Sequence, residues 1–185
     1  MTAGTAITPA ELRQLLDYNP ETGALTWKLR RRNPAVHLRE HERWNSRHAG
    51  TSAGYVGAWG YIIVKVYRNA FKAHRLAWAI YHGAWPSPGL FIDHINRDKA
   101  DNRIINLRLA TRSENGLNRP NPANNTSGMK GVYWASRNGK WAATIGIDNA
   151  KHRLGYFTSY EAACAAYVKA ARQLYGDFAH IDTSR

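Results

Sequence analysis

The segment from residue 90 to residue 117 constrains the fold of this chain more than any other. Two short segments that have the pattern of strands, Leu90 to Ile95 and Ile104 to Leu109, flank a polar loop. Thr111-Arg112-Ser113-Glu114 follows with the spacing of a capping box, which opens a helix. The order strand, loop, strand, helix predicts a small hairpin with a helix packed across it.

Four residues of this segment could act together: an acid, an imidazole and two amides. Asp93 and His94 are adjacent on the first predicted strand, Asn106 is on the second, and Asn115 is in the first turns of the helix. An antiparallel pair brings Asn106 opposite His94. A helix across the hairpin brings Asn115 near Asp93.

These residue types suit the hydrolysis of a phosphodiester. A neutral His94 can accept a proton from an attacking water when an amide such as that of Asn106 holds its ring. Asp93 and Asn115 offer hard oxygen ligands to Mg²⁺ or Mn²⁺, which stabilises a leaving oxygen. Asn118, one helical turn further on, competes with Asn115 as the second ligand. This interpretation requires that the ring of His94 reaches solvent and that Asp93 faces room for an ion.

The sequence FIDHINRDKADNRIINLRLATRSENGLN, preceded by KAHRLAWAIYHG, resembles the HNH endonucleases of phages and introns. The resemblance is to the members in which the final His of the motif is Asn. The resemblance implies a ββα-metal fold, catalytic roles for His94 and Asn106, and metal ligation by Asp93 and Asn115. It also implies products with a 3′-hydroxyl and a 5′-phosphate, and a phage or mobile-element origin. ITPAELRQLLDYNPETGALTWK resembles the amino-terminal part of such proteins, so the likeness covers residues 7–119.

Further elements are expected before this segment. Thr8, Pro9 and Glu11 predict a capped helix, and residues 24–27 predict a strand. Residues 33–53 show little periodicity and are expected to be irregular. Residues 60–67 predict a strand that returns at 71–72, and residues 74–82 predict a helix.

The carboxy-terminal part predicts three antiparallel strands and a helix. The strands are residues 131–134, 141–147 and 152–157, and an Ala-rich helix runs from 158 to 176. Residues 127–182 resemble the plant ethylene-response-factor, or APETALA-type, DNA-binding module, which uses its sheet face to bind DNA. We expect at least one of Trp134, Trp141 and Tyr156 to pack in the core.

The predicted fold class is therefore α+β: a ββα-metal HNH nuclease domain followed by a small three-stranded antiparallel sheet packed on one helix. The domains are expected at residues 1–119, with an amino-terminal extension, and 127–182, joined by a linker at 120–126 that is rich in Pro and Asn.

A large positive charge indicates a polyanionic partner. The 185 residues carry 26 Lys and Arg against 13 Asp and Glu, a net +13 spread along the chain. Charge alone does not distinguish DNA from RNA or from an anionic membrane. Because both modules resemble DNA-binding families, double-stranded DNA is the expected partner and no membrane is expected. The candidate DNA-binding residues are Arg30, Arg31, Arg32, Arg75, Lys130, Tyr133, Arg137, Lys140, Lys151 and Arg153.

The sequence leaves several alternatives open. A DNA-binding regulator that does not cut is the main rival to a metal-dependent endonuclease, and a binder of structured RNA is the third class. Nicking and double-strand cleavage are both compatible with the sequence, as are a monomer and a homodimer. One cysteine, Cys164, and an amino terminus without a long apolar run favour a cytoplasmic protein. The resemblance to phage HNH endonucleases implies that the cell is a phage's bacterial host.

Overall fold

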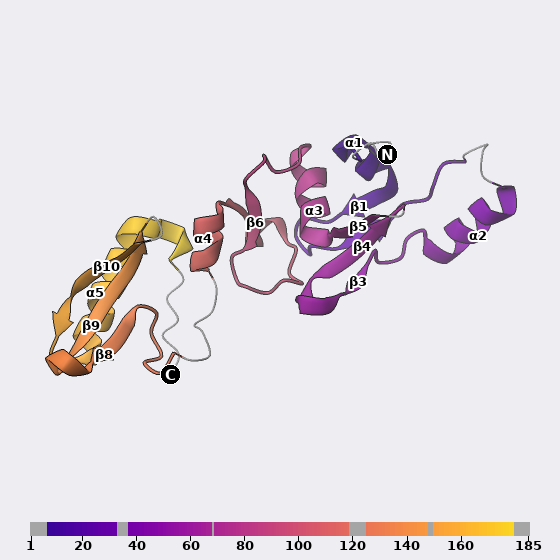
Figure 1. Ribbon diagram of the computed structural model, residues 1–185. Coiled ribbons are helices and arrows are strands. Elements are labelled where there is room, and N and C mark those ends of the chain that lie inside the picture. Colours follow the sequence, from indigo (N-terminus) through magenta and orange to yellow (C-terminus); the bar gives the residue numbers. More distant parts are fainter. Residues whose placement is uncertain (1–6, 33–36, 68, 119–124, 148–149, 180–185) are drawn as a thin grey trace, which may run out of the picture. The chain divides into compact units, whose positions relative to one another are not determined.

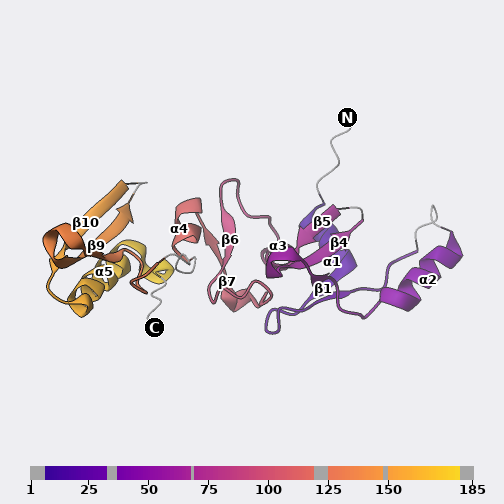
Figure 2. The same ribbon diagram turned by 60° about the horizontal axis from the view of Figure 1, so that its bottom comes forward.

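The computed structural model describes residues 7–32, 37–67, 69–118, 125–147 and 150–179. It divides into two compact units, Met1–Thr111 and Arg112–Arg185 (Figures 1 and 2). Helices and small antiparallel sheets occur in both, which confirms the predicted α+β class. The domain limits at residues 119 and 127 stay predictions, and residues 120–124 of the predicted linker lie outside the described residues.

The first unit consists of short elements joined in three small antiparallel sheets, β1–β2, β3–β4–β5 and β6–β7. Its elements are α1 (Pro9–Leu15), β1 (Leu16–Tyr18), β2 (Leu25–Trp27), α2 (Leu38–His48), β3 (Tyr55–Val56), η1 (Ala58–Gly60), β4 (Ile62–Val66), β5 (Asn69–Lys72), α3 (Ala73–His82), β6 (Phe91–His94), η2 (Ile104–Asn106) and β7 (Leu107–Ala110).

Helix α3 lies at the centre of the first unit because its apolar residues serve two clusters. Leu76 packs with Leu12 and Leu16 in the main core, where all three side chains are fully buried. Ala77 packs with Ile92 and Leu107 of the β6–β7 hairpin. The predicted capping box of α1 is present, so the sequence signal at Thr8 and Glu11 is confirmed. Burial of these apolar side chains fixes the hairpin against α3.

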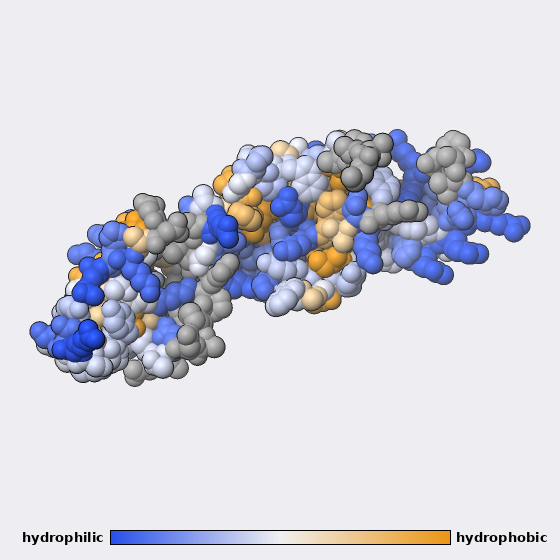
Figure 3. Space-filling model, viewed as in Figure 1, coloured by the Kyte–Doolittle hydropathy of each residue, from blue (hydrophilic) through white to orange (hydrophobic). Residues whose placement is uncertain are grey.

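The expectation that residues 33–53 are irregular is wrong, since α2 spans Leu38–His48. This helix buries none of its residues, and hydrophilic side chains cover it in Figure 3. It therefore lacks the apolar stripe on which helix prediction depends. Its contacts are to the preceding strand and loop: Trp44 meets Trp27 edge to face at 5.6 Å, and Arg30 stacks on Trp44 at 3.3 Å.

The second unit contains a three-stranded antiparallel sheet in the order β10–β9–β8, with α5 packed on it (Figure 1). Its elements are α4 (Arg112–Leu117), β8 (Val132–Ala135), η3 (Ser136–Asn138), β9 (Lys140–Ile147), β10 (Ala150–Phe157), α5 (Tyr160–Tyr175) and η4 (Gly176–Phe178). Trp141 packs edge to face on Tyr160 of α5 at 4.9 Å, so the expectation of a core tryptophan is confirmed.

The predicted turn at residues 148–149 lies outside the described residues. Within the parts of the chain that the structure describes, no helix combines the length and the apolar character needed to cross a bilayer.

The β1–β2 turn contacts the chain just before β7. The Tyr18 hydroxyl donates to the carbonyl of Asn102 at 2.7 Å, and Ile104 N donates to the carbonyl of Pro20 at 3.0 Å. Gly23 is buried in this turn with φ +75°, and a Cβ on it would lie 2.6 Å from backbone atoms of Asn102 and Arg103. The amino-terminal hairpin therefore fixes the backbone around Asn102.

We expect Gly23→Ala to destabilise the first unit by about 3 kcal/mol, because the substitution combines backbone strain with a clash against backbone. Gly50→Ala is the matched control: Gly50 has φ +79° and nothing within 4 Å of an added Cβ, so it suffers the strain alone. Urea unfolding of both variants measures the difference. Equal losses of stability would contradict the close packing of Gly23 on the Asn102 segment.

Candidate active site

The β6–β7 hairpin places Asp93 and His94 at the end of β6. The register pairs Asp93 with Arg108 and His94 with Leu107. The expectation that Asn106 lies opposite His94 is therefore wrong by one residue, because η2 takes up Ile104–Asn106 before β7 begins. Asn106 lies at the start of the pairing, where its side chain faces the loop between the strands.

Asp93 forms an ion pair with Arg108 across the hairpin. The Nε and Nη2 atoms of Arg108 lie 3.0 and 2.9 Å from Oδ2 of Asp93. The two side chains retain 15% and 7% of their exposure, Arg108 having the larger value. A carboxylate this deeply buried needs such a partner, since an unpaired charge there would be costly.

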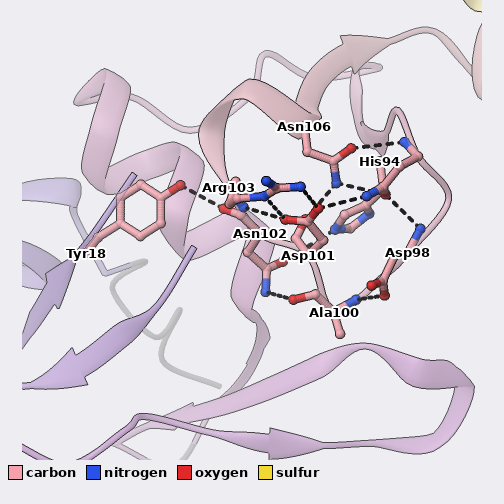
Figure 4. A network of polar contacts seen from close by, with 9 residues as sticks. Tyr18, His94, Asp98, Ala100, Asp101, Asn102, Arg103 and Asn106 are labelled. Atoms are coloured by element: carbon pink, nitrogen blue, oxygen red, sulfur yellow. Dashed lines mark hydrogen bonds and ion pairs between the residues drawn. The ribbon is translucent and has the colours of Figure 1, made fainter. Parts of the chain in front are cut away.

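The imidazole of His94 contacts the side-chain amide of Asn102. Figure 4 shows the polar network that surrounds the two residues. Nε2 of His94 lies 3.4 Å from Oδ1 of Asn102. Asn102 is buried, and its Nδ2 donates to the carbonyl of Ala100 at 3.1 Å, which directs Oδ1 toward the ring. An acceptor at Nε2 assigns the proton to that nitrogen and leaves the lone pair on Nδ1. In this tautomer Nδ1 is the nitrogen of His94 that can accept a proton.

Asn106 organises the loop that carries Asn102. Its Oδ1 accepts from Asn96 N at 3.0 Å, and its Nδ2 donates to Asn96 Oδ1 at 3.0 Å and to the Asp101 carbonyl at 2.8 Å (Figure 4). Asp101 in turn accepts from Arg103, which lowers the pKa of Asp101 to about 2. The predicted orienting action of Asn106 on His94 is therefore indirect in this structure, through the loop.

Two aromatic rings lie against His94. The ring of His74, at the start of α3, meets it edge to face at 4.9 Å, and the ring of Tyr61 is 6.1 Å away. His94 and Asp93 retain 5% and 6% of their exposure. The expectation that the His94 ring reaches solvent is therefore not met, because neighbouring rings from the β4 and α3 regions and the 96–106 loop enclose it.

Burial keeps both imidazoles neutral. Desolvation lowers the pKa of His94, against a smaller raising effect of the hydrogen bond to Asn102 and of the carboxylate of Asp93. The pKa of His74 falls to about 3, mainly through burial, then through repulsion between the protonated forms of His74 and His94, and through the positive charges of Lys72 and Arg75. Its Nδ1 is buried without a hydrogen-bond partner.

This burial makes the stability of the first unit depend on pH. Between about pH 3 and 6.5 the unfolded chain binds a proton at His74 that the folded chain does not. His74 therefore does not reduce the free energy of unfolding above pH 6.5. Below pH 6.5 it lowers that free energy by up to about 1.4 kcal/mol per pH unit.

We expect the substitution His74→Gln to flatten this dependence of the unfolding free energy on pH. His82→Gln, which replaces an exposed histidine of α3, should preserve it. Urea unfolding at a series of pH values tests this, and equal slopes in all three proteins would contradict it.

The predicted metal ligands fall in different units. Asp93 is in the first unit, whereas Asn115 lies half-buried in α4 and Asn118 lies buried just after it, in the second. Their meeting at one ion stays a prediction. The donor set itself suits Mg²⁺, because it consists of a carboxylate and amide oxygens. The described residues contain no group of three His, Cys, Asp or Glu that could hold a metal, so amides and water would complete the shell.

The candidate DNA-binding residues occupy distinct settings. Arg31 and Arg32 are exposed, Arg30 is half-buried on Trp44, and Arg75 lies near the ring of Trp85 at 5.8 Å. In the second unit, the register places four of the predicted residues on the sheet face opposite the core, namely Tyr133, Lys140, Lys151 and Arg153. Arg137 is exposed in η3, and Lys130 is half-buried before β8.

Sequence reasoning missed Asn102, Arg108 and Tyr61. Arg108 had a usable signal, since an acid and a base at paired positions of a hairpin attract each other, but the expected register was one residue off. Asn102 had no such signal, because an Asp-Asn sequence is typical of turns. Tyr61 comes from a strand far from the motif in sequence.

Comparisons with known proteins show what this segment and the rest of the chain are similar to. Residues 71–117 match the family profile of the HNH endonucleases. Over 118 residues the chain is 33% identical to Protein 3.8 of Escherichia phage T7, a match that covers 62% of this chain and 96% of the phage protein. It is 32% identical over 126 residues to the uncharacterized HNH endonuclease L560 of Acanthamoeba polyphaga mimivirus, covering 68% of this chain and 64% of that protein.

A solved structure of DNA binding and cleavage by the HNH homing endonuclease I-HmuI is also similar, with 20% identity and a TM-score of 0.38 over 82% of this chain and 76% of that one. A likeness of that size does not support an assignment. The family profile does, and it shows that residues 71–117 carry a segment of the HNH endonuclease family.

Proposed function

We propose that this protein is a divalent-metal-dependent DNA endonuclease that hydrolyses phosphodiester bonds, with Asp93 and His94 at its centre. The observation that carries the proposal is the fixed imidazole of His94. Its tautomer is set by a buried amide within the segment that matches the HNH family. A neutral, oriented imidazole is what general-base catalysis requires.

The chain's own residues would act as follows. Nδ1 of His94 accepts a proton from a water whose oxygen attacks phosphorus. The bond from phosphorus to the 3′-oxygen breaks, that oxygen takes a proton from solvent, and the products carry a 3′-hydroxyl and a 5′-phosphate. Asn102 holds the ring during the transfer, and its neutral amide leaves the imidazole less basic than a carboxylate partner would.

A metal would be held by Asp93 and by Asn115 or Asn118. The cation supplies positive charge that stabilises the leaving oxygen. On the protein side, Arg108 already compensates Asp93 through one oxygen, Oδ2. The site thus combines one buried carboxylate with amides and a single base.

The sheet of the second unit would hold the DNA, in the manner of the ethylene-response-factor modules that its sequence resembles. Arg153 lies over the ring of Tyr156 at 4.8 Å, and Lys151 lies two residues before it on β10. Tyr133 and Tyr156 both pair with Ala142, so two exposed aromatic rings flank a small residue beside these cations. Such a face can bind phosphates and reach base edges.

A DNA-binding regulator that does not cut is the second candidate. One observation favours it: Asp93 and His94 are both enclosed, with Asp93 engaged by Arg108. The nuclease requires that the cover of His94 opens when DNA binds, whereas the regulator requires no opening.

Cleavage of supercoiled plasmid with Mg²⁺ or Mn²⁺ decides between the two. We expect cutting by the wild-type protein, none with EDTA, and a loss of about a thousandfold in His94→Ala, since a general base contributes roughly 10²- to 10⁴-fold. DNA affinity of His94→Ala should stay within about twofold, because the ring is not a charged contact.

The matched control is His82→Ala, which removes an exposed histidine of α3. It should cut as the wild-type protein does. Binding of duplex DNA without cleavage under any metal would establish the regulator. Mapping the ends and the number of cut strands then separates nicking from a double break.

The role of the sheet is tested by Lys151→Gln and Arg153→Gln. Each should weaken DNA binding and, where the contact is to phosphate, make the slope of log affinity against log salt shallower by about one unit. Lys169→Gln, on the exposed side of α5, removes the same charge and should leave the slope unchanged. Equal effects of the three substitutions would show general attraction in place of a binding face.

A further inference from the structure

Two lysines of the first unit meet on one aromatic ring beside His94. The Nζ atoms of Lys72 and Lys99 lie 3.9 and 5.1 Å from the centroid of Tyr61. Tyr61 contacts His74 at 5.3 Å and His94 at 6.1 Å, so one half-buried ring joins the lysines to both imidazoles. Lys72 ends β5, and Lys99 comes from the loop that follows β6, so the cluster is built by tertiary contacts.

The two lysines of this cluster have no directly paired carboxylate within the described residues, although Asp98, Asp101 and Asp93 lie near enough to act on His94. Asp101 and Asp93 themselves pair with arginines close by. Lys99 and Arg75 lie near enough to lower the pKa of Lys72, in addition to the effect of its burial. Cations held together without an acid destabilise the free protein, and an anion between them would offset that cost.

Lys99 is also fixed in place. Its Nζ donates to the carbonyl of Trp59 at 3.0 Å. Trp59 has φ 74°, a conformation that costs free energy for a residue other than glycine, and its side chain is 84% exposed. Backbone strain of this kind persists where the surrounding structure enforces it, and it gathers at binding sites. The strained η1 turn thus presents the carbonyl that orients one of the two lysines.

We infer that Lys72 and Lys99, positioned by Tyr61, bind a backbone phosphate of the DNA strand next to the linkage that is hydrolysed with His94 as the general base. The inference rests on the proposed function for its substrate. Lys72 and Lys99 are both exposed residues, and an ammonium group is the right kind of donor for a phosphate oxygen. A phosphate held there lies against the ring that covers His94, so binding and access to the imidazole involve the same residue, Tyr61.

The test measures binding of a short fluorescein-labelled DNA duplex by anisotropy, in a His94→Ala background with EDTA so that nothing is cut. Lys72→Gln and Lys99→Gln should each weaken binding about tenfold at low salt, which corresponds to one charge-assisted hydrogen bond. Each should make the salt slope shallower by about one unit. In the cutting-competent protein the same changes should raise KM for plasmid more than they lower kcat.

Lys65→Gln is the matched control, because Lys65 is an exposed lysine on β4 of the same sheet, near Tyr55 and not Tyr61. Tyr61→Phe should bind as the parent does, since the ring is kept, whereas Tyr61→Leu should lose affinity as the lysine variants do. Thermal melting confirms that each variant is folded.

The outcomes separate this inference from the proposed function. Wild-type cleavage with Lys72 and Lys99 variants no weaker than Lys65→Gln would overturn the phosphate site and leave the nuclease standing. Absence of cleavage with a selective loss of binding in the Lys72 and Lys99 variants would overturn the nuclease and retain the phosphate site.

Discussion

The contact between Asn102 and His94 is the interaction on which the rest of the site depends. A fully buried amide must satisfy its own polar atoms, and here one end binds the Ala100 carbonyl while the other faces the imidazole. The backbone of the same residue is anchored by the Tyr18 hydroxyl, whose pKa burial raises to about 12, so that it remains a donor. The amino-terminal hairpin therefore acts on the imidazole through a single residue.

Hydrogen bonds connect the loop between β6 and β7. Asn96, Asp101 and Asn106 bond to one another and to the backbone. In such a network each member satisfies another, so loss of one leaves several groups unpaired. The apolar cluster of Ala77, Ile92 and Leu107 fixes the strands on α3, and the polar network fixes what lies between them. Packing thus positions the hairpin, and hydrogen bonds position the imidazole of His94.

Prediction from sequence succeeded where a local rule governs the structure. Alternation and turn residues located β4, β9 and β10, and the capping box located α1. Prediction failed where tertiary contacts govern the structure, as for α2. Trp44 is the large apolar residue of this helix that packs on the rest of the unit, through its contact with Trp27. The one-residue slip in the hairpin arose because a 3₁₀ turn at Ile104–Asn106 replaced the start of the expected strand. Asn102, Tyr61 and His74 became part of the site only through folding.

The burial of His94 and the cations around it solve one electrostatic problem together. Bringing a polyanion next to an imidazole raises its pKa and favours the protonated form, which cannot act as a base. Desolvation has already lowered the pKa of His94, and the adjacent His74 is held neutral by burial and by Lys72 and Arg75. The rise that a nearby phosphate would cause therefore starts from a lowered pKa, and a phosphate bound as we infer at Lys72 and Lys99 would have its field partly offset by those lysines. In the free protein, burial and nearby cations therefore act on the imidazole of His94 in the same direction, toward its neutral form.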